Sequence, residues 1–518
     1  MLQHLLYVVS PCRFQEFKSA MERLKAEPMD GPSMTSNYEI KHRMLEGMVL
    51  HVSILSDIDG VTPYLRQHPV DLLIYDERGE EIPESYEGIK RIRKDVKQLA
   101  ELWGPEFQFP SSRIVAILNK TADVDHRVFQ LGRMNVRDVI VDPKNTALVL
   151  RWISDLLYHG IKRTNKVGLA LSGGAIEGFL YQIGVIHGLN QALTHRHLGD
   201  VDAVSGVSSG SIAGSMVVGN IPIEEVLKSL HGKKAKVPPI RISTLFDFAG
   251  FQILRRFISV SLNMRTTPIS QWLNRLASSV PTGFFKGNKL EEYFEECTKA
   301  YGAGERFSDL DRRFFVGVTD QDSFKHVTFG KPPFEHIPIS AAVRASAALP
   351  PLYVPKTING RNYIDGQITR SCNLESVIEA GSRLVFIIDP LKPFQSHTAG
   401  SADKEGGFYG IIQMTKALVS TRFEASLKAM GERYPDVDFM VFQPDEECAK
   451  LMSGSPLKAK FRTEIIEAAY RGTLRKLRER HKVYSTIMGR YGFYLKDEED
   501  LRNLEGRYDE ILNPTSKG

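Results

Sequence analysis

A short apolar segment that leads directly into Gly-x-Ser-x-Gly is the feature that most constrains how this chain can fold. DAVSGV at 202–207 predicts a buried strand, and SSGSIAGSMVVG at 208–219 predicts a helix immediately after it. Glycines on both sides of Ser208 allow a sharp strand-to-helix turn, so we expect an exposed Ser208 hydroxyl beside the positive end of the helix. Ser208 is therefore a candidate nucleophile.

A second strand, loop and helix precede this motif. VGLAL at 167–171 predicts a strand, SGGAIEG at 172–178 a glycine-rich loop, and a helix follows with Phe179, Ile183, Ile186 and Leu189 on one face. The backbone N–H groups of Gly173, Gly174 and Ala175 are candidates to bind an oxyanion. A phosphate-binding loop and a simple tight turn remain alternatives, although the Gly-Lys-Ser/Thr ending of a P-loop is missing.

The third element is YIDG at 363–366. Asn359-Gly360 just before it predicts a type I′ hairpin turn, which places Asp365 at the end of a strand. Such a carboxylate can accept the proton of Ser208 and return it to the leaving group. The alternative is that Asp365-Gly366 is only a turn.

These three elements, in this order, resemble the patatin-like phospholipase family over about residues 165–390. AAVRASAALPPLYVP at 341–355 also matches the small-residue and proline tract of that family. The resemblance implies a three-layer α/β/α fold, a modified α/β-hydrolase arrangement, with a Ser208–Asp365 dyad and an oxyanion hole at Gly173, Gly174 and Ala175. It also implies hydrolysis of phospholipid or other lipid esters with no cofactor and no metal.

Three residues depart from the family pattern. Ala175 replaces a third glycine, which is tolerable if its backbone angle is ordinary. Glu177 stands where a basic residue is usual, and an acid there opposes a developing negative charge unless it points to solvent. Gln367 follows Asp365-Gly366 in place of a small residue. We therefore predict reduced or restricted activity.

A Ser-His-Asp triad is the nearest chemical alternative, and it requires a histidine downstream of Ser208. Only His397 follows a predicted strand, RLVFIID at 383–389, in a position from which it can return to the sheet edge. The candidates are His231, His326, His336, His397 and His481.

Residues 1–160 predict a separate α/β domain that resembles a response-regulator receiver, with a flavodoxin-like fold. LLYVVS at 5–10, VDLLIYD at 70–76, RIVAILN at 113–119 and RDVIVDP at 137–143 predict its strands, and 145–158 predicts a closing helix. Asp76 occupies the place of the family's phosphoacceptor. Ser10-Pro11 and Asp142-Pro143 replace the metal-binding acids and the Lys-Pro pair, so we predict a pseudo-receiver. The alternative is that Asp76 starts a solvated loop.

The remaining segments complete a predicted division into 1–160, a patatin-like domain at 161–400, and a mainly helical extension at 401–518 packed on the catalytic domain. VDFMVFQ at 437–443 predicts a strand, and RGTLRKLRERHK at 471–482 a helix with Leu474 and Leu477 facing inward. TLFDFAGFQILRRFISVSL at 244–262 predicts a lid or interfacial helix, or else a simple cover over the sheet.

Composition limits the classes of partner. The net charge of +5 comes from interspersed Lys and Arg, which argues against nucleic-acid binding and suits weak attraction to anionic membranes. The four cysteines lie far apart, so neither a disulfide framework nor a zinc site is predicted. We expect a cytoplasmic protein that associates peripherally and transiently with membranes, with a homodimer through the N-terminal domain as one option.

The sequence therefore predicts a serine lipid acyl hydrolase with an N-terminal regulatory domain. The alternative from another class is a catalytically impaired, lipid-sensing regulatory protein of the same fold, suggested by Glu177 and by the degraded receiver positions.

Overall fold

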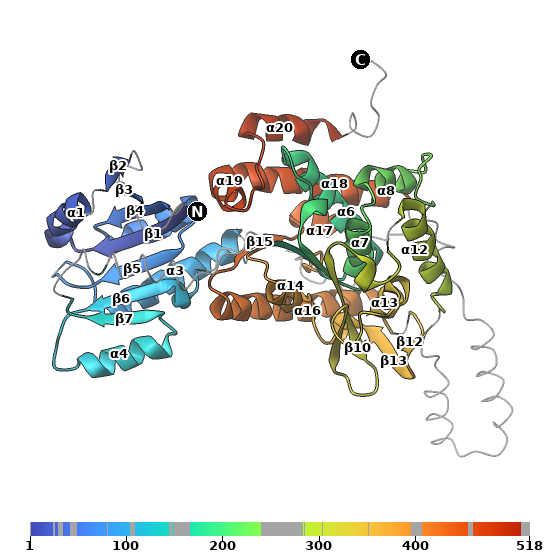
Figure 1. The fold of residues 1–518 in the computed structure, drawn as a ribbon, viewed down its shortest axis with the longest axis horizontal. Helices are drawn as coiled ribbons and strands as arrows, with labels where there is room; N and C mark the ends of the chain where they lie inside the picture. Colours follow the sequence, from blue (N-terminus) through green and yellow to red (C-terminus); the bar gives the residue numbers. More distant parts are fainter. Residues whose placement is uncertain are drawn as a thin grey trace. The chain divides into compact units, whose positions relative to one another are not determined.

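The computed structural model of this 518-residue chain contains two compact units (Figure 1). It describes residues 2–23, 26–29, 35–41, 49–79, 81–103, 109–143, 149, 166–239, 283, 285–302, 304–350, 352–394, 407–453 and 459–508. Unit 1 comprises residues 1–165, 424–439 and 480–495, and unit 2 comprises 166–423, 440–479 and 496–518. The segment after residue 400 thus contributes to both units.

Unit 1 is built on a seven-stranded sheet in the order β2-β3-β4-β1-β5-β6-β7. Its strands are β1 (Leu2–Val9), β2 (Glu27–Met29), β3 (Ser36–Lys41), β4 (Val49–Leu55), β5 (Leu72–Asp76), β6 (Ile114–Leu118) and β7 (Asp138–Val141), and its helices include α1 (Phe14–Arg23), α2 (Val61–Gln67), α3 (Ser85–Trp103), α4 (Val124–Arg133) and α19 (His481–Gly489). The run β4-β1-β5-β6-β7 is parallel throughout. It has the 2-1-3-4-5 order of flavodoxin-like folds, as predicted.

The four predicted strands of unit 1 are β1, β5, β6 and β7. Every residue of β5 and β6 is buried, as expected for strands of a parallel sheet that is covered on both faces. β4 was not predicted because His51 and Ser53 interrupt its apolar pattern; buried Ser53 is satisfied by hydrogen bonds with His4, Asn37 and Tyr64. The helix predicted at 145–158 falls outside the described residues.

Unit 2 contains the second sheet. Its strands are β8 (Val167–Leu171), β9 (Ala203–Val207), β10 (Arg313–Asp320), β11 (His326–Phe329), β12 (Lys356–Ile358), β13 (Arg361–Asp365), β14 (Leu384–Ile388) and β15 (Asp438–Phe442), and its helices include α6 (Ala175–Ala192), α7 (Ser209–Val218), α8 (Ile223–Leu230), α12 (Asn288–Tyr301), α13 (Ile339–Ser346), α14 (Leu374–Glu379), α17 (Glu446–Leu451), α18 (Ala459–Glu479) and α20 (Glu498–Gly506). α16 (Gly407–Arg433) and β15 contribute residues to both units.

The strand order β12-β13-β10-β9-β8-β14-β15 sets which loops share an edge, and β11 pairs separately with β10. β10, β9, β8 and β14 are parallel, so the loops that follow them lie at the same edge of the sheet. Helices α6, α7 and α18 lie on one face, and α14 and α16 on the other (Figure 1). This is the predicted three-layer α/β/α arrangement.

The first helix of unit 2 is buried more completely than predicted. The sequence indicated one apolar face on α6, but all residues from Gly178 to Leu189 are buried. The reason is that α18, far away in the sequence, packs along α6. In α18 itself, Leu474 and Leu477 are fully buried, as predicted.

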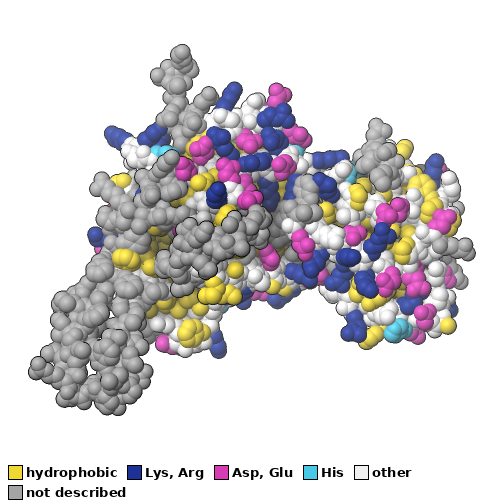
Figure 2. Space-filling model, turned by 180° about the vertical axis from the view of Figure 1, so that it is seen from behind, with side chains coloured by type: hydrophobic (Ala, Val, Ile, Leu, Met, Phe, Trp, Pro, Cys, Tyr) yellow, Lys and Arg dark blue, Asp and Glu magenta, His cyan; other side chains and the backbone are white. Residues whose placement is uncertain are grey.

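Charged residues are dispersed over the face seen in Figure 2. Lys and Arg side chains lie among Asp and Glu there and do not merge into one continuous basic surface. Across the described part of the chain, no helix is both long enough and apolar enough to cross a membrane.

Candidate active site

Ser208 lies at the turn between β9 and α7, where the chain reverses sharply. Its backbone angles are φ 53° and ψ −126°, a sparsely populated conformation for a residue with a side chain. A β-carbon on Gly206 would overlap the backbone of residues 210–211, and one on Gly210 would overlap the backbone of residues 171–172. Both glycines of the motif are therefore required for the turn, which has the strained geometry of a nucleophile elbow.

A serine from the small-residue tract holds this turn in place. Ser346, at the end of α13, accepts the Ser208 N–H at 2.8 Å and donates its own hydroxyl to the Gly317 carbonyl at 2.7 Å. Ser346 is fully buried, so neither bond competes with solvent. Ser208 is only 6% exposed, which differs from the exposed hydroxyl that the motif predicted.

The glycine-rich loop follows β8 and lies against Ser208. A β-carbon on Gly173 would come within 2.7 Å of the Ser208 Cβ. Among the described residues, no backbone carbonyl accepts the N–H groups of Gly173 and Gly174. An oxyanion hole requires hydrogen-bond donors that lie next to the nucleophile and are not already bonded to another acceptor.

Alanine at position 175 was expected to be tolerable if its backbone angle were ordinary, and it is not. Its φ is 54°, in the left-handed region that favours glycine, so its β-carbon introduces strain of about 1 kcal/mol. Part of the loop is thus strained at the position where the family pattern has a third glycine.

A buried carboxyl anchors the start of this loop. Asp389, directly after β14, accepts the Ser172 hydroxyl at 2.7 Å and the Gln443 side-chain amide at 2.8 Å. Burial raises the pKa of Asp389, and these hydrogen bonds oppose the rise. From the sequence, Asp389 was predicted only as the last residue of a strand; the signal for its anchoring role is an acid at the carboxyl end of a buried apolar run.

Asp365 ends β13, after the predicted hairpin. Asn359 and Gly360 have φ values of 51° and 75°, as a type I′ turn requires, so this prediction is confirmed. The Asp365 carboxyl is fully buried: Oδ1 accepts the Gln367 N–H at 2.9 Å, while Oδ2 has no hydrogen-bond partner of ordinary geometry among the described residues. Burial raises the pKa of Asp365 to about 6, and hydrogen bonding from Ser208 and the Gln367 N–H opposes that rise.

β10 brings Ser208 and Asp365 to the same place. It pairs in parallel with β9, with Gly317 opposite Val207, and antiparallel with β13, with Val318 opposite Asp365. The two candidate residues therefore lie on either side of one intervening strand. β10 was not predicted from the sequence, although its residues, RFFVGVTD, include the aromatic and β-branched types typical of a buried strand.

Two of the histidines that were candidates for a triad, His231 and His326, have other partners in the structure. His326 interacts with Thr369 and Thr328 through its two ring nitrogens, and burial lowers its pKa to about 4. The His231 Nδ1 interacts with the Leu227 carbonyl. His397, the best-placed candidate, falls outside the described residues, as does the predicted lid at 244–262.

Comparison with known protein families assigns a family to the part of the chain that contains Ser208 and Asp365. Residues 169–378 match the model of the patatin-like phospholipase family. The chain contains a patatin-like phospholipase domain. Ser208, the glycine-rich loop and Asp365 all lie within the matched residues.

Solved structures show weaker similarity. VipD from Legionella pneumophila is 15% identical with a TM-score of 0.29, over 68% of this chain and 81% of that chain. The G domain of the T. maritima FeoB iron transporter is 10% identical with a TM-score of 0.21, over 31% of this chain and 99% of that chain. The FeoB cytosolic domain in a GDP form is 12% identical with a TM-score of 0.19, over 58% and 98%.

Glu177, the acid in the first turn of α6 in the patatin-like domain, has a cation near it on α16, beyond the residues matched to that family. Burial raises the pKa of Glu177, and Lys416 of α16 opposes that rise. Burial lowers the pKa of Lys416, and Glu177 opposes that fall in turn. The two groups partly neutralise each other, which weakens the repulsion that Glu177 was predicted to exert on an oxyanion. Within the described residues, no cluster of three or more His, Cys, Asp or Glu is placed to hold a metal ion.

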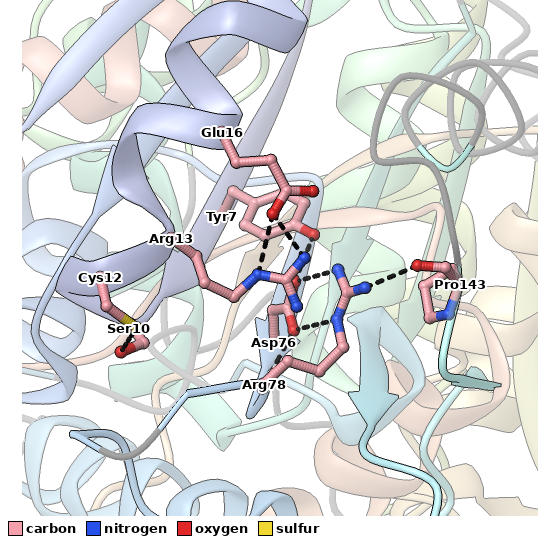
Figure 3. A network of polar contacts seen from close by, with 8 residues as sticks. All are labelled: Tyr7, Ser10, Cys12, Arg13, Glu16, Asp76, Arg78 and Pro143. Atoms are coloured by element: carbon pink, nitrogen blue, oxygen red, sulfur yellow. Dashed lines mark hydrogen bonds and ion pairs between the residues drawn. The ribbon is translucent and has the colours of Figure 1, made fainter.

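In unit 1, outside the patatin-like domain, the side chains of Tyr7 and Arg78 lie against the Asp76 carboxylate (Figure 3). Arg78 donates Nε and Nη2 to the two carboxylate oxygens at 2.8 and 2.7 Å, and the Tyr7 hydroxyl donates to Oδ2 at 3.0 Å. Arg78 also donates to the Pro143 carbonyl at 2.7 Å. Asp76 is fully buried, so the alternative that it starts a solvated loop is wrong. The pseudo-receiver role stays a prediction.

Proposed function

We propose that this protein is a serine acyl hydrolase that cleaves acyl esters of phospholipids or related lipids through Ser208 and Asp365. The patatin-like domain supports lipid acyl hydrolase activity in general. The observation that carries the proposal is the strained Ser208 turn next to a buried carboxyl whose pKa is raised to about 6. A base with a pKa near the working pH both accepts and returns a proton efficiently.

In the proposed acylation step, the Ser208 hydroxyl proton moves to Asp365 as Oγ bonds to the ester carbonyl carbon. The electron pair of the C=O π bond moves onto the oxygen and makes it an oxyanion. When this intermediate collapses, the C–O bond to the alcohol breaks and the alcohol takes the proton from Asp365. Water then repeats the sequence on the acyl-serine and releases the fatty acid. The sequence of steps is balanced without a metal or cofactor.

The oxyanion is proposed to be bound by the N–H groups of Gly173, Gly174 and Ala175. These donors need no rearrangement to reach it, because Asp389 anchors Ser172 at the start of the loop. Preorganised donors in a water-poor site stabilise a developing charge more strongly than solvent does. The strain at Ala175 predicts that this chain's hole is less favourable than one with glycine at that position.

The decisive experiment compares wild type with Ser208→Ala and Asp365→Asn on phosphatidylcholine and phosphatidylglycerol vesicles, measuring released fatty acid. We expect wild type to react with a fluorophosphonate probe and to release fatty acid, Ser208→Ala to do neither, and Asp365→Asn to fall to background release. Fatty acid release that survives Ser208→Ala would reject the proposal. A difference between the two vesicle types also tests the proposed transient contact with anionic membranes.

A lipid-sensing protein with impaired turnover is the second candidate, favoured by the left-handed Ala175 and by Glu177. It predicts that wild type binds vesicles but neither labels with the probe nor releases fatty acid. In either case we propose unit 1 as a regulatory domain. Its proposed pairing in a homodimer is tested by light scattering on the full chain.

A further inference from the structure

Gln367 follows the candidate base at a position where the family pattern has a small residue. Hydrogen bonds to its backbone N–H and carbonyl hold its main chain in place. It lies in the short 3-10 helix Gly366–Ile368, and its N–H donates to the Asp365 Oδ1 at 2.9 Å. Its carbonyl accepts from Nη2 of Arg422 on α16, and the same guanidinium donates Nη1 to the Ile368 carbonyl at 2.9 Å. With both backbone groups bound, the direction in which its Cα–Cβ bond leaves the chain is set.

That side chain is directed at the oxyanion loop. A β-carbon on Gly173 would overlap the Gln367 Oε1 and come within 2.8 Å of its Cδ. The same β-carbon would lie 2.7 Å from the Ser208 Cβ. The Gln367 carboxamide, the loop backbone and the candidate nucleophile therefore meet around one point.

Within the described part of the chain, the amide nitrogen of this side chain lacks an acceptor, but the atom nearest to Gly173 is the amide oxygen Oε1, so a half-turn of the carboxamide is needed to aim the nitrogen at the loop. Gln367 Nε2 is buried and has no hydrogen-bond partner among the described residues. Buried polar groups are nearly always paired, so an unpaired donor beside a nucleophile indicates an acceptor that arrives with the substrate. An ester carbonyl oxygen at Ser208 would be that acceptor, and its need for a donor increases as negative charge develops.

We propose that the Gln367 side chain is an additional oxyanion donor, supplementing the backbone N–H groups of Gly173 and Gly174. This inference rests on the proposed hydrolase function and deepens it. The donor is neutral, so it adds no charge beside the Asp365 base. It also offers a reason why the chain tolerates a strained Ala175 and an acid at Glu177.

The test uses Gln367→Met, which keeps the length of the side chain and removes the donor, and Gln367→Ala, which removes both. Steady-state hydrolysis of p-nitrophenyl butyrate separates kcat from KM. We expect kcat to fall about 10- to 100-fold in both variants, with KM changed less than about 3-fold, because the bond forms mainly in the transition state. Gln321→Met, on the turn after β10, serves as the control and retains wild-type kcat.

The competing role for Gln367 is a plug that fills the hole. A plug predicts that Gln367→Ala raises kcat, and that outcome overturns the proposal, as does an unchanged kcat in Gln367→Met. Thermal unfolding of each variant shows whether a loss of rate reflects a loss of fold; if Gln367→Met unfolds, Gln367→Ala decides. If wild type itself is inactive, the proposed function and this inference both fail. If wild type is active and Ser208-dependent, an unchanged Gln367→Met rejects the inference alone.

Discussion

Because the Asp365 carboxyl is buried, we predict that its ionised form, which is needed for catalysis, lowers the stability of the folded protein. Burial raises its pKa from an ordinary 3.8 to about 6, so the folded state holds the charged form less favourably than the unfolded chain does. Each pKa unit corresponds to about 1.36 kcal/mol, which gives about 3 kcal/mol. Asp365→Asn should therefore abolish hydrolysis and yet make the protein more stable at pH 8 by up to about 3 kcal/mol.

The sign of the pH dependence follows from proton linkage. Because the folded-state pKa is the higher one, protonation stabilises the folded wild type as the pH falls through about 6, and this effect is complete below 3.8. The stability advantage of Asp365→Asn should therefore shrink below pH 6 and vanish near pH 4. In the active wild type, kcat/KM should fall about tenfold per pH unit below about 6, since the base must be ionised.

Urea unfolding of both proteins at pH 8, 6 and 4.5 measures the difference, and hydrogen exchange at matched pH on peptides from β9 and β13 restricts the comparison to unit 2. Asp320→Asn is a control of opposite sign. Hydrogen bonds from the Ser323 N–H and from Arg361 lower the pKa of Asp320, so its removal should destabilise the fold at pH 8. Equal stability of wild type and Asp365→Asn at pH 8, or a gap at pH 4.5 as large as the gap at pH 8, would refute the reasoning, because only about 1 kcal/mol should remain at pH 4.5.

Three further predictions concern residues that support the sites. Ala175→Gly removes the strain of a left-handed alanine, so unfolding should require about 1 kcal/mol more and kcat should rise; a lower melting temperature would contradict this. Ser346→Ala leaves a buried N–H and carbonyl unpaired, so urea unfolding should show a loss of about 1–3 kcal/mol together with a lower kcat. Arg78→Met leaves the buried Asp76 carboxylate without its ion-pair partner, so urea unfolding should show unit 1 destabilised by about 3–5 kcal/mol. If the lost ion pair is the cause, the double variant Arg78→Met/Asp76→Asn should recover most of that stability.

Local sequence determined the elements whose cause is local. Gly206 and Gly210 around Ser208 permit a turn that few other residues could form, and Asn359-Gly360 selects its hairpin by backbone angle alone. The buried strands β8, β9 and β14 follow from short apolar runs. These signals were sufficient to predict the layered fold, the family and the candidate residues Ser208 and Asp365.

Tertiary structure alone decided how those residues act on one another. Ser208 and Asp365 are brought together by β10, whose pairing on both sides depends on contacts distant in the sequence. The supports from Ser346, Asp389 and Arg422 come from elements remote from the groups that they hold. The raised pKa of Asp365 arises from burial, which no short stretch of sequence specifies. In the sequence, Gln367 is only a departure from the family pattern. The tertiary structure brings its carboxamide to Gly173, next to Ser208, and so suggests a chemical role that can be tested.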